Sequence, residues 1–235
     1  NDFVGEVICA WPMFVNMRTY RALHNKHHAA TNTHKDPDFR RERFPTSRQE
    51  ILKMLGRDIL GLNTLHQLRE VKRLKVANQK VPTIYKILKP AFYITALSLI
   101  TYFRVWPAFI GLWVVPLFTW LKVCLRIRSI ADHSGPGLQD LPHPFNTRTV
   151  IPNLFDRIFI APRNSSYHIE HTVYASIPNY NLKKCHDEFM KLPIFQENAR
   201  ISHGYISLLN EWPDISEVDL KWEEQYNKQF NASLA

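Results

Sequence analysis

The sequence predicts an all-α protein, a membrane helical bundle with a transmembrane hairpin at about residues 87–125 and a cytosolic helical cap that carries clustered histidines. Three observations predict this fold class. Two apolar stretches flank a short turn, basic residues lie at both outer ends of these stretches, and the eleven histidines are clustered elsewhere in the chain. With 235 residues, 45% of them hydrophobic, the chain is long enough for a buried core and is not disordered or collagen-like. We expect a single domain over residues 1–235.

The segments before the hairpin are mixed in character. Residues 3–15 are apolar but interrupted by Glu6 and Pro12, which predicts the end of another crossing or an interfacial helix. Residues 40–73 combine charges with apolar residues at helical spacing. We expect one or two amphipathic helices there, on the membrane surface or capping the domain.

The hairpin is formed by residues 91–103 and 108–121, which carry no charge. Each stretch is shorter than the roughly 20 residues that a bilayer helix needs. Extended to Ile87 and Leu125, both approach that length, and Lys89 and Lys122 then lie near the ends, where lysine side chains can reach the headgroups. The alternative is a buried helical hairpin in a soluble core, which the slightly polar mean hydropathy of −0.27 favours.

The charge distribution predicts the orientation of the hairpin. The turn carries only Arg104, whereas several basic residues flank the outer ends: Lys80, Lys86, Lys89, Lys122, Arg126 and Arg128. This asymmetry predicts that both outer ends are cytoplasmic. The formal net charge of +9 fits a lipid surface, and since no nucleic-acid recognition motif is present we expect no nucleic-acid partner. Three scattered cysteines exclude a disulfide scaffold.

The first histidine cluster precedes the hairpin. His24, His27 and His28 have the spacing i, i+3 and i+4, which predicts three imidazoles on one helical face and favours metal binding over a solvated basic stretch. Asp36 and Asp38 follow, and either could accept the second ring N–H of a ligating histidine. A simple turn around Pro37 is the equally favoured alternative for these aspartates.

The remaining candidate ligands follow the hairpin. His168 and His171 are one helical turn apart, and His133 comes just after the second apolar stretch. Six histidines exceed the four ligands of a structural zinc site, so the surplus indicates two metals. An all-imidazole set without thiolates at a membrane face suits a di-iron centre that activates dioxygen. A carboxylate-bridged di-iron site would need Glu-x-x-His pairs, whereas Glu170 and His171 are adjacent.

The segments HNKHHAATNTHKDPD, RSIADHSG and YHIEHTVYASIPNYNL resemble the membrane fatty acid desaturase superfamily and its histidine boxes. The resemblance implies that the iron ligands are His24, His27, His28, His133, His168 and His171. No catalytic residue is expected beyond these ligands. Candidates for orienting them are Asp36, Asp38, Asp132, Asn164 and Glu170.

The same resemblance implies an oxidoreductase with two non-haem irons. It would desaturate a fatty acyl chain, lipid-linked or thioester, with O2 and with electrons from a separate ferredoxin or b5-type cytochrome. The protein would be integral to the membrane, with its histidine boxes on the cytoplasmic face.

Two departures from the family pattern leave alternatives open. No first histidine box precedes His24, so we expect an N-terminally truncated chain that begins just after it. Thr172 occupies the position of the last histidine in the third box, and a hydroxyl is a poor iron ligand. Either one iron is under-coordinated, a water or another side chain takes the place of the missing ligand, or the protein is a catalytically degenerate member. A hydroxylase or ketolase of the carotenoid type is the other alternative.

Overall fold

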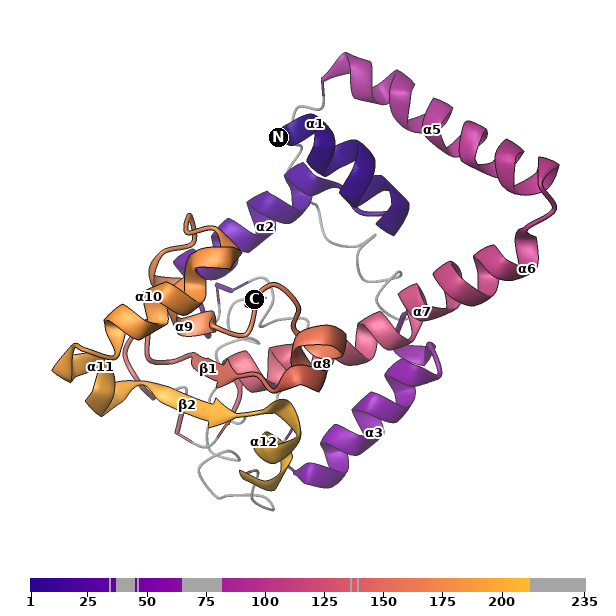
Figure 1. Cartoon of the computed structure of the whole chain (residues 1–235). Coiled ribbons are helices and arrows are strands. Elements are labelled where there is room, and N and C mark those ends of the chain that lie inside the picture. Colours follow the sequence, from indigo (N-terminus) through magenta and orange to yellow (C-terminus); the bar gives the residue numbers. More distant parts are fainter. Residues whose placement is uncertain are drawn as a thin grey trace, which may run out of the picture. The chain divides into compact units, whose positions relative to one another are not determined.

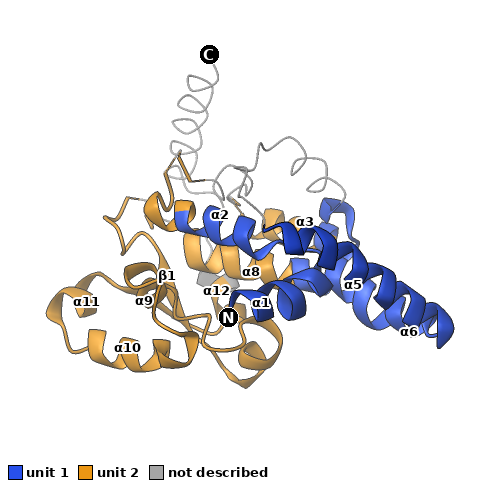
Figure 2. Ribbon diagram, turned by 90° about the horizontal axis from the view of Figure 1, so that it is seen from above, with its two compact units in different colours: residues 1–25, 57–122 blue, residues 26–56, 123–235 orange. Residues whose placement is uncertain are grey.

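The computed structural model describes residues 1–33, 35–36, 45, 47–64, 82–135, 137–138 and 140–211 (Figure 1). The described chain is mostly helical, which confirms that part of the prediction, while the two short strands that it contains depart from the predicted all-α class. It divides into two compact units, residues 1–25 with 57–122 and residues 26–56 with 123–235, coloured separately in Figure 2.

The N-terminal segment of the first unit packs against the hairpin. It consists of α1 (Asp2–Val4), a π-helical turn (Gly5–Ala10) and a 3-10 turn (Trp11–Met13). The buried ring of Trp11 makes edge contacts with Tyr85 and Phe92 at centroid distances of 6.1 and 5.5 Å. The Trp113 indole donates to the Pro12 carbonyl at 3.0 Å. Residues 3–15 are therefore a set of short helical turns.

Helix α2 (Met17–Ala29) follows this segment. Its first two free backbone amides, at Met17 and Arg18, donate to the buried carboxylate of Glu6 at 3.4 and 3.3 Å. A carboxylate at a helix N-terminus satisfies amides that have no intrahelical acceptor. Glu6, which interrupts the apolar residues 3–15, thus fixes the start of the helix that carries the first histidine cluster.

The hairpin consists of α5 (Thr83–Tyr102) and a second helical run from residue 106 to residue 133. The second run is made of α6 (Trp106–Phe109), a π-helical turn (Ile110–Val114), α7 (Val115–Phe118) and α8 (Trp120–His133). The π turn precedes Pro116, which has no N–H to donate to the preceding turn. The chain reverses at Arg104, as predicted.

The apolar side chains of the hairpin are exposed. No residue of α5 is buried, and Leu112 in the second run is 79% exposed. A core hairpin of a soluble protein would bury these side chains, so the exposure argues against that alternative. Both helices are long and apolar enough to form a membrane hairpin.

The second unit is held together by two hydrophobic clusters. Helix α3 (Arg48–Ile59) is the described part of the predicted amphipathic region, while most of residues 40–46 and 65–73 lie outside the described residues. Its Ile51 packs with Ile130 and Ala131 of α8 and with Tyr205 of α12 (Tyr205–Glu211). A smaller cluster joins Phe145 to Ile169 and Phe195.

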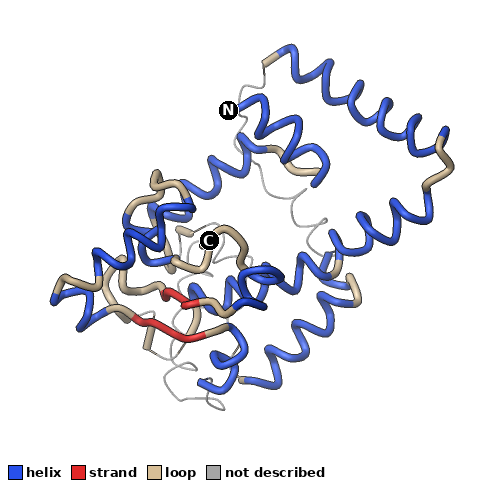
Figure 3. Tube along the Cα trace, in the orientation of Figure 1, coloured by secondary structure: helices blue, strands red, loops and turns tan. Residues whose placement is uncertain are grey.

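Two strands pair in parallel in this unit, coloured red in Figure 3. Strand β1 (Arg148–Ile151) contains the β-branched run Thr-Val-Ile, and Arg148 pairs with Arg200 of β2 (Arg200–His203). Parallel strands need a long connection. Here it contains a π-helical turn (Asp156–Ile160), α9 (His168–Val173), a 3-10 turn (Asn179–Asn181), α10 (Leu182–Phe189) and α11 (Pro193–Asn198).

Candidate metal centre

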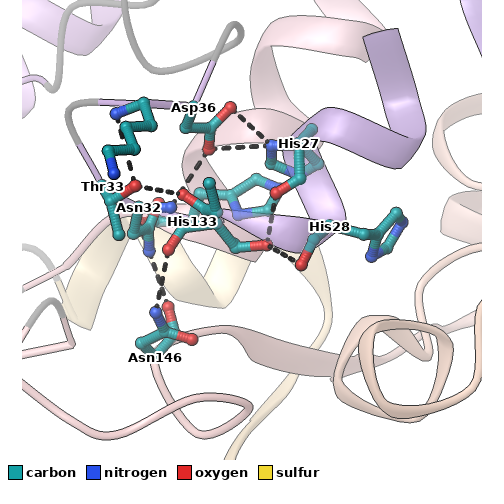
Figure 4. A network of polar contacts seen from close by, with 10 residues as sticks. His27, His28, Asn32, Thr33, Asp36, His133 and Asn146 are labelled. Carbon is teal, nitrogen blue, oxygen red and sulfur yellow. Dashed lines mark hydrogen bonds and ion pairs between the residues drawn. The ribbon is translucent and has the colours of Figure 1, made fainter. Parts of the chain in front are cut away.

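His27 is buried near the end of α2 and is held by a carboxylate. Its Nδ1 donates to the Asp36 carboxylate at 2.8–2.9 Å, and the backbone N–H of Asn32 donates to the same carboxylate at 3.0 Å (Figure 4). Because a carboxylate only accepts, this contact places the ring proton on Nδ1, so that Nε2 is the ring nitrogen that carries the lone pair. The structure thus places the Asp36 carboxylate on the ring of His27, whereas Asp38 lies outside the described residues.

Two asparagines, which sequence reasoning missed, tie the end of α2 to His133. The Asn32 side chain donates to the carbonyls of His133 and Asn146 at 3.1 and 2.7 Å (Figure 4). The Asn146 side chain donates back to the Thr31 carbonyl at 3.2 Å. Asn32 has a φ of 58°, a left-handed conformation that asparagine tolerates better than most residues. These bonds fix where α8 presents His133.

His27, His133 and His168 form the first histidine group. One ring nitrogen from each lies within 4.8 Å of the others. The ring centroids of His133 are 4.7 Å from His27 and 4.6 Å from His168. The group therefore joins three elements that are far apart in sequence: α2, the end of α8 and the start of α9.

His168 has the electrostatic surroundings of a ligand. Burial lowers the pKa of His168 well below its ordinary value, and the imidazoles of His133 and His171 lower it further. The Nδ1 of His168 lies 3.8 Å from an oxygen of Asp132. Its buried Nε2 makes no hydrogen bond with any described residue. A neutral imidazole with a buried, unused lone pair is the form that binds a metal.

His28 and His171 form the second histidine group. Their Nε2 atoms are 3.1 Å apart. Two nitrogens bound at about 2.1 Å to one metal, with an angle near 95°, would be separated by about the same distance. His24 lies one turn before His28 on the same helix, about 40° around its axis, so α2 adds His24 to the side of His28.

The helical face predicted for the first cluster is thus divided between the two groups. His27 and His28 are neighbours in sequence and differ by about 100° around the helix axis. Each therefore serves a different group, a division that the spacing i, i+3, i+4 did not reveal.

Helix α9, which carries His168 and His171, is anchored by a buried network. Glu170 is 0% exposed; it accepts from the Thr149 hydroxyl at 2.6 Å and lies 2.6 Å from Nδ1 of His186. The Thr149 hydroxyl also accepts from the Ile169 amide at 3.1 Å. Glu170 thus supports the helix rather than a ligating ring. His186 is a residue that the sequence analysis did not single out, because its contact with Glu170 depends on how α10 packs.

Thr172 and Asn164 are the remaining residues that the sequence analysis singled out. Thr172 is only 6% exposed, and its hydroxyl makes no hydrogen bond with any described residue. A buried hydroxyl without a hydrogen-bond partner among the described residues thus stands where the family pattern expects a histidine. The Asn164 side chain donates to the Asn179 carbonyl at 3.2 Å and makes no bond to a histidine within the described chain.

The two groups fit a di-metal site. All their members offer imidazole nitrogens, which suit iron, zinc or copper, and thiolates are absent from both groups. Among protein-family models, the fatty acid desaturase model matches residues 1–202 of the chain. The chain belongs to the fatty acid desaturase family. No curated protein and no solved structure matches this desaturase-family chain. The family match ends within β2, the strand that pairs with β1.

We expect Asp36→Asn to weaken metal binding at the first group about 10- to 100-fold, the range for residues that orient a ligand. The amide can turn its NH2 toward Nδ1 of His27, which would favour the wrong tautomer. Metal retained during titration with a chelator measures the effect. Asp187→Asn is the control, because Asp187 is exposed and pairs only with Lys183 among the described residues. Equal retention in the two variants would contradict the role of Asp36.

Proposed function

We propose that this protein is an O2-dependent desaturase of a fatty acyl chain, lipid-linked or thioester, with two non-haem irons. The observation that carries the proposal is that five of the six predicted histidines lie in two groups, His27, His133 and His168 in one and His28 and His171 in the other. We assign His27, His133 and His168 to one iron and His24, His28 and His171 to the other. Membership of the fatty acid desaturase family supports the reaction class.

In this proposal, the histidines bind the irons, and carboxylates orient the histidine rings. Asp36 holds the ring of His27, and Asp132 lies beside that of His168. Burial of His27 and His168 keeps water from both rings. Two irons bound here supply, with O2 and two electrons, the oxidising power to remove two hydrogens from an unactivated –CH2–CH2– unit. The products are –CH=CH– and two waters, with two protons taken up.

The proposal includes the setting of the site. We infer a single functional domain over residues 1–235, integral to a membrane through the hairpin of α5 and the run 106–133. The basic residues at the outer ends of the hairpin support a cytoplasmic position for the histidines. The electrons would come from a separate ferredoxin or b5-type cytochrome.

The test is iron content and product mass for the protein expressed from its complete gene and purified in detergent. We expect about two irons per chain and a product about two mass units lighter than the substrate. A double variant, His27→Ala with His171→Ala, removes one ligand from each group and should lose both irons. The matched control is His143→Ala with His203→Ala, two exposed histidines outside the groups.

The same measurements separate the alternatives. A product heavier by about 16 or 14 mass units would identify a hydroxylase or ketolase. The buried hydroxyl of Thr172 favours a second candidate, a catalytically degenerate member. Absence of iron, or zinc alone, would support this candidate, and a gain of iron and activity in Thr172→His would show that one missing ligand limits the site.

A further inference from the structure

An apolar patch lies on the surface of the second unit, between β1 and α9. It consists of Leu154, Phe155, Ile158 and Phe159, which are 75%, 46%, 59% and 49% exposed. The rings of Phe155 and Phe159 contact each other, with centroids 4.9 Å apart. Four large apolar side chains together on a six-residue segment are more than the scattered exposure that a soluble surface normally shows.

The patch is rigidly anchored on its inner side. Asp156 is fully buried, and its carboxylate accepts from the amides of Asn153 and Tyr205 at 3.2 and 3.3 Å. Ile160 and Ala161, directly after the patch, belong to the main hydrophobic cluster of this unit. The same segment therefore has a fixed polar and apolar interior and an apolar outer face, so the exposed side chains are presented by a folded support.

A hydrogen bond attaches the patch to α8 near the end of the apolar part of the run 106–133. The Cys124 thiol donates to the Phe159 carbonyl at 3.1 Å. Cys124 lies in the part of the run 106–133 where the uncharged apolar stretch ends and basic residues begin, at Lys122 and Arg126. If that run crosses a bilayer, this level is the boundary between lipid and water.

The charges beside the patch are positive. Arg157 and Arg163 are both exposed, while the acidic residue within the segment, Asp156, points inward and is buried. Apolar side chains flanked by arginines are typical of segments that lie in a membrane interface and contact anionic headgroups.

We propose that residues 154–159 insert into the interface of a bilayer that contains anionic lipid, next to the first turns of α8. The patch is then a membrane contact in addition to the hairpin. It belongs to the second unit, which also carries both histidine groups. The inference rests on the proposed function in one respect, that the run 106–133 spans the membrane.

The test measures where single fluorescent labels lie in membranes. The full chain carries Cys9→Ser and Cys185→Ser, and the buried Cys124 is kept. A bimane label is attached at Ile158→Cys, and the same protein without this substitution measures any labelling of Cys124. The matched control is Ile194→Cys on α11, because Ile194 is 61% exposed and lies outside the patch. Leu97→Cys on α5 reports separately whether the hairpin is embedded.

Each protein is placed in nanodiscs with about 30 mol% phosphatidylglycerol in phosphatidylcholine, a composition with an anionic surface. We expect nitroxide-labelled lipid to quench the label at residue 158 at least about threefold more than the label at residue 194. Aqueous iodide should show the reverse order. Adding Arg157→Gln and Arg163→Gln should reduce the lipid quenching at residue 158 in anionic discs but not in phosphatidylcholine alone.

The outcomes distinguish the patch from the hairpin. Lipid quenching at residue 97 with only iodide quenching at residue 158 would overturn the patch and leave the hairpin intact. The same iodide result is expected of a face that receives a protein partner. Lipid quenching at residue 158 without any at residue 97 would overturn the hairpin, and with it the argument that places the patch beside a membrane-spanning run.

Discussion

Replacing His168 with alanine is expected to remove the metal of the first histidine group and to abolish activity. Only His27 and His133 would remain there. The loss should exceed the roughly 10- to 100-fold weakening that follows when an orienting residue is changed, since a ligand itself is deleted. Iron per chain should fall from about two to about one or less, the number expected if one of two sites empties.

The control for this variant is His203→Ala. His203 is exposed at the end of β2 and belongs to neither group. It should keep its iron and activity. Thermal unfolding of both variants checks that loss of metal in His168→Ala does not come from general unfolding. A His168→Ala protein that folds and retains two irons would contradict the assignment of His168.

Replacing Glu170 with alanine is expected to destabilise the second unit strongly. The change leaves the Thr149 hydroxyl and Nδ1 of His186 without their buried acceptor. Each such loss costs about 1–3 kcal/mol, so the two together should lower the free energy of unfolding by about 2–6 kcal/mol. For a chain of this size, the melting temperature should decrease by roughly 4–24 °C. Calorimetry in detergent measures it.

Glu188→Ala on α10 is the matched control. Glu188 is exposed and pairs with Lys191 at the surface, where such pairs contribute at most about 1 kcal/mol. The structural role of Glu170 also predicts that Glu170→Ala loses iron only as α9 loosens, and that Glu170→Gln retains most of the stability. A melting temperature equal to that of Glu188→Ala would show that the buried network contributes little.

The sequence predicted those features that depend on local spacing. Composition alone located the hairpin and its turn at Arg104, and helical spacing located His24, His27 and His28 on one helix. Asp36 was also predicted, because it follows these ligands closely enough to fold back onto them. These are properties of segments a few turns long, for which periodicity is informative.

The features that the sequence did not predict depend on long-range packing. Strand β1 has four residues, too few for a clear alternating pattern, and its parallel partner lies about 50 residues later. The bonds of Asn32 to His133 and of His186 to Glu170 also join separate elements. The division of His27 and His28 between two groups depends on where α8 and α9 pack around α2.

The supports of the two histidine groups are shared. Helix α2 provides His27 to the first group and His28 to the second, and α9 provides His168 and His171 in the same way. A rotation or shift of either helix therefore moves a ligand in both groups. Metals bound there would be perturbed together, so a substitution that displaces α2 or α9 is expected to affect both sites.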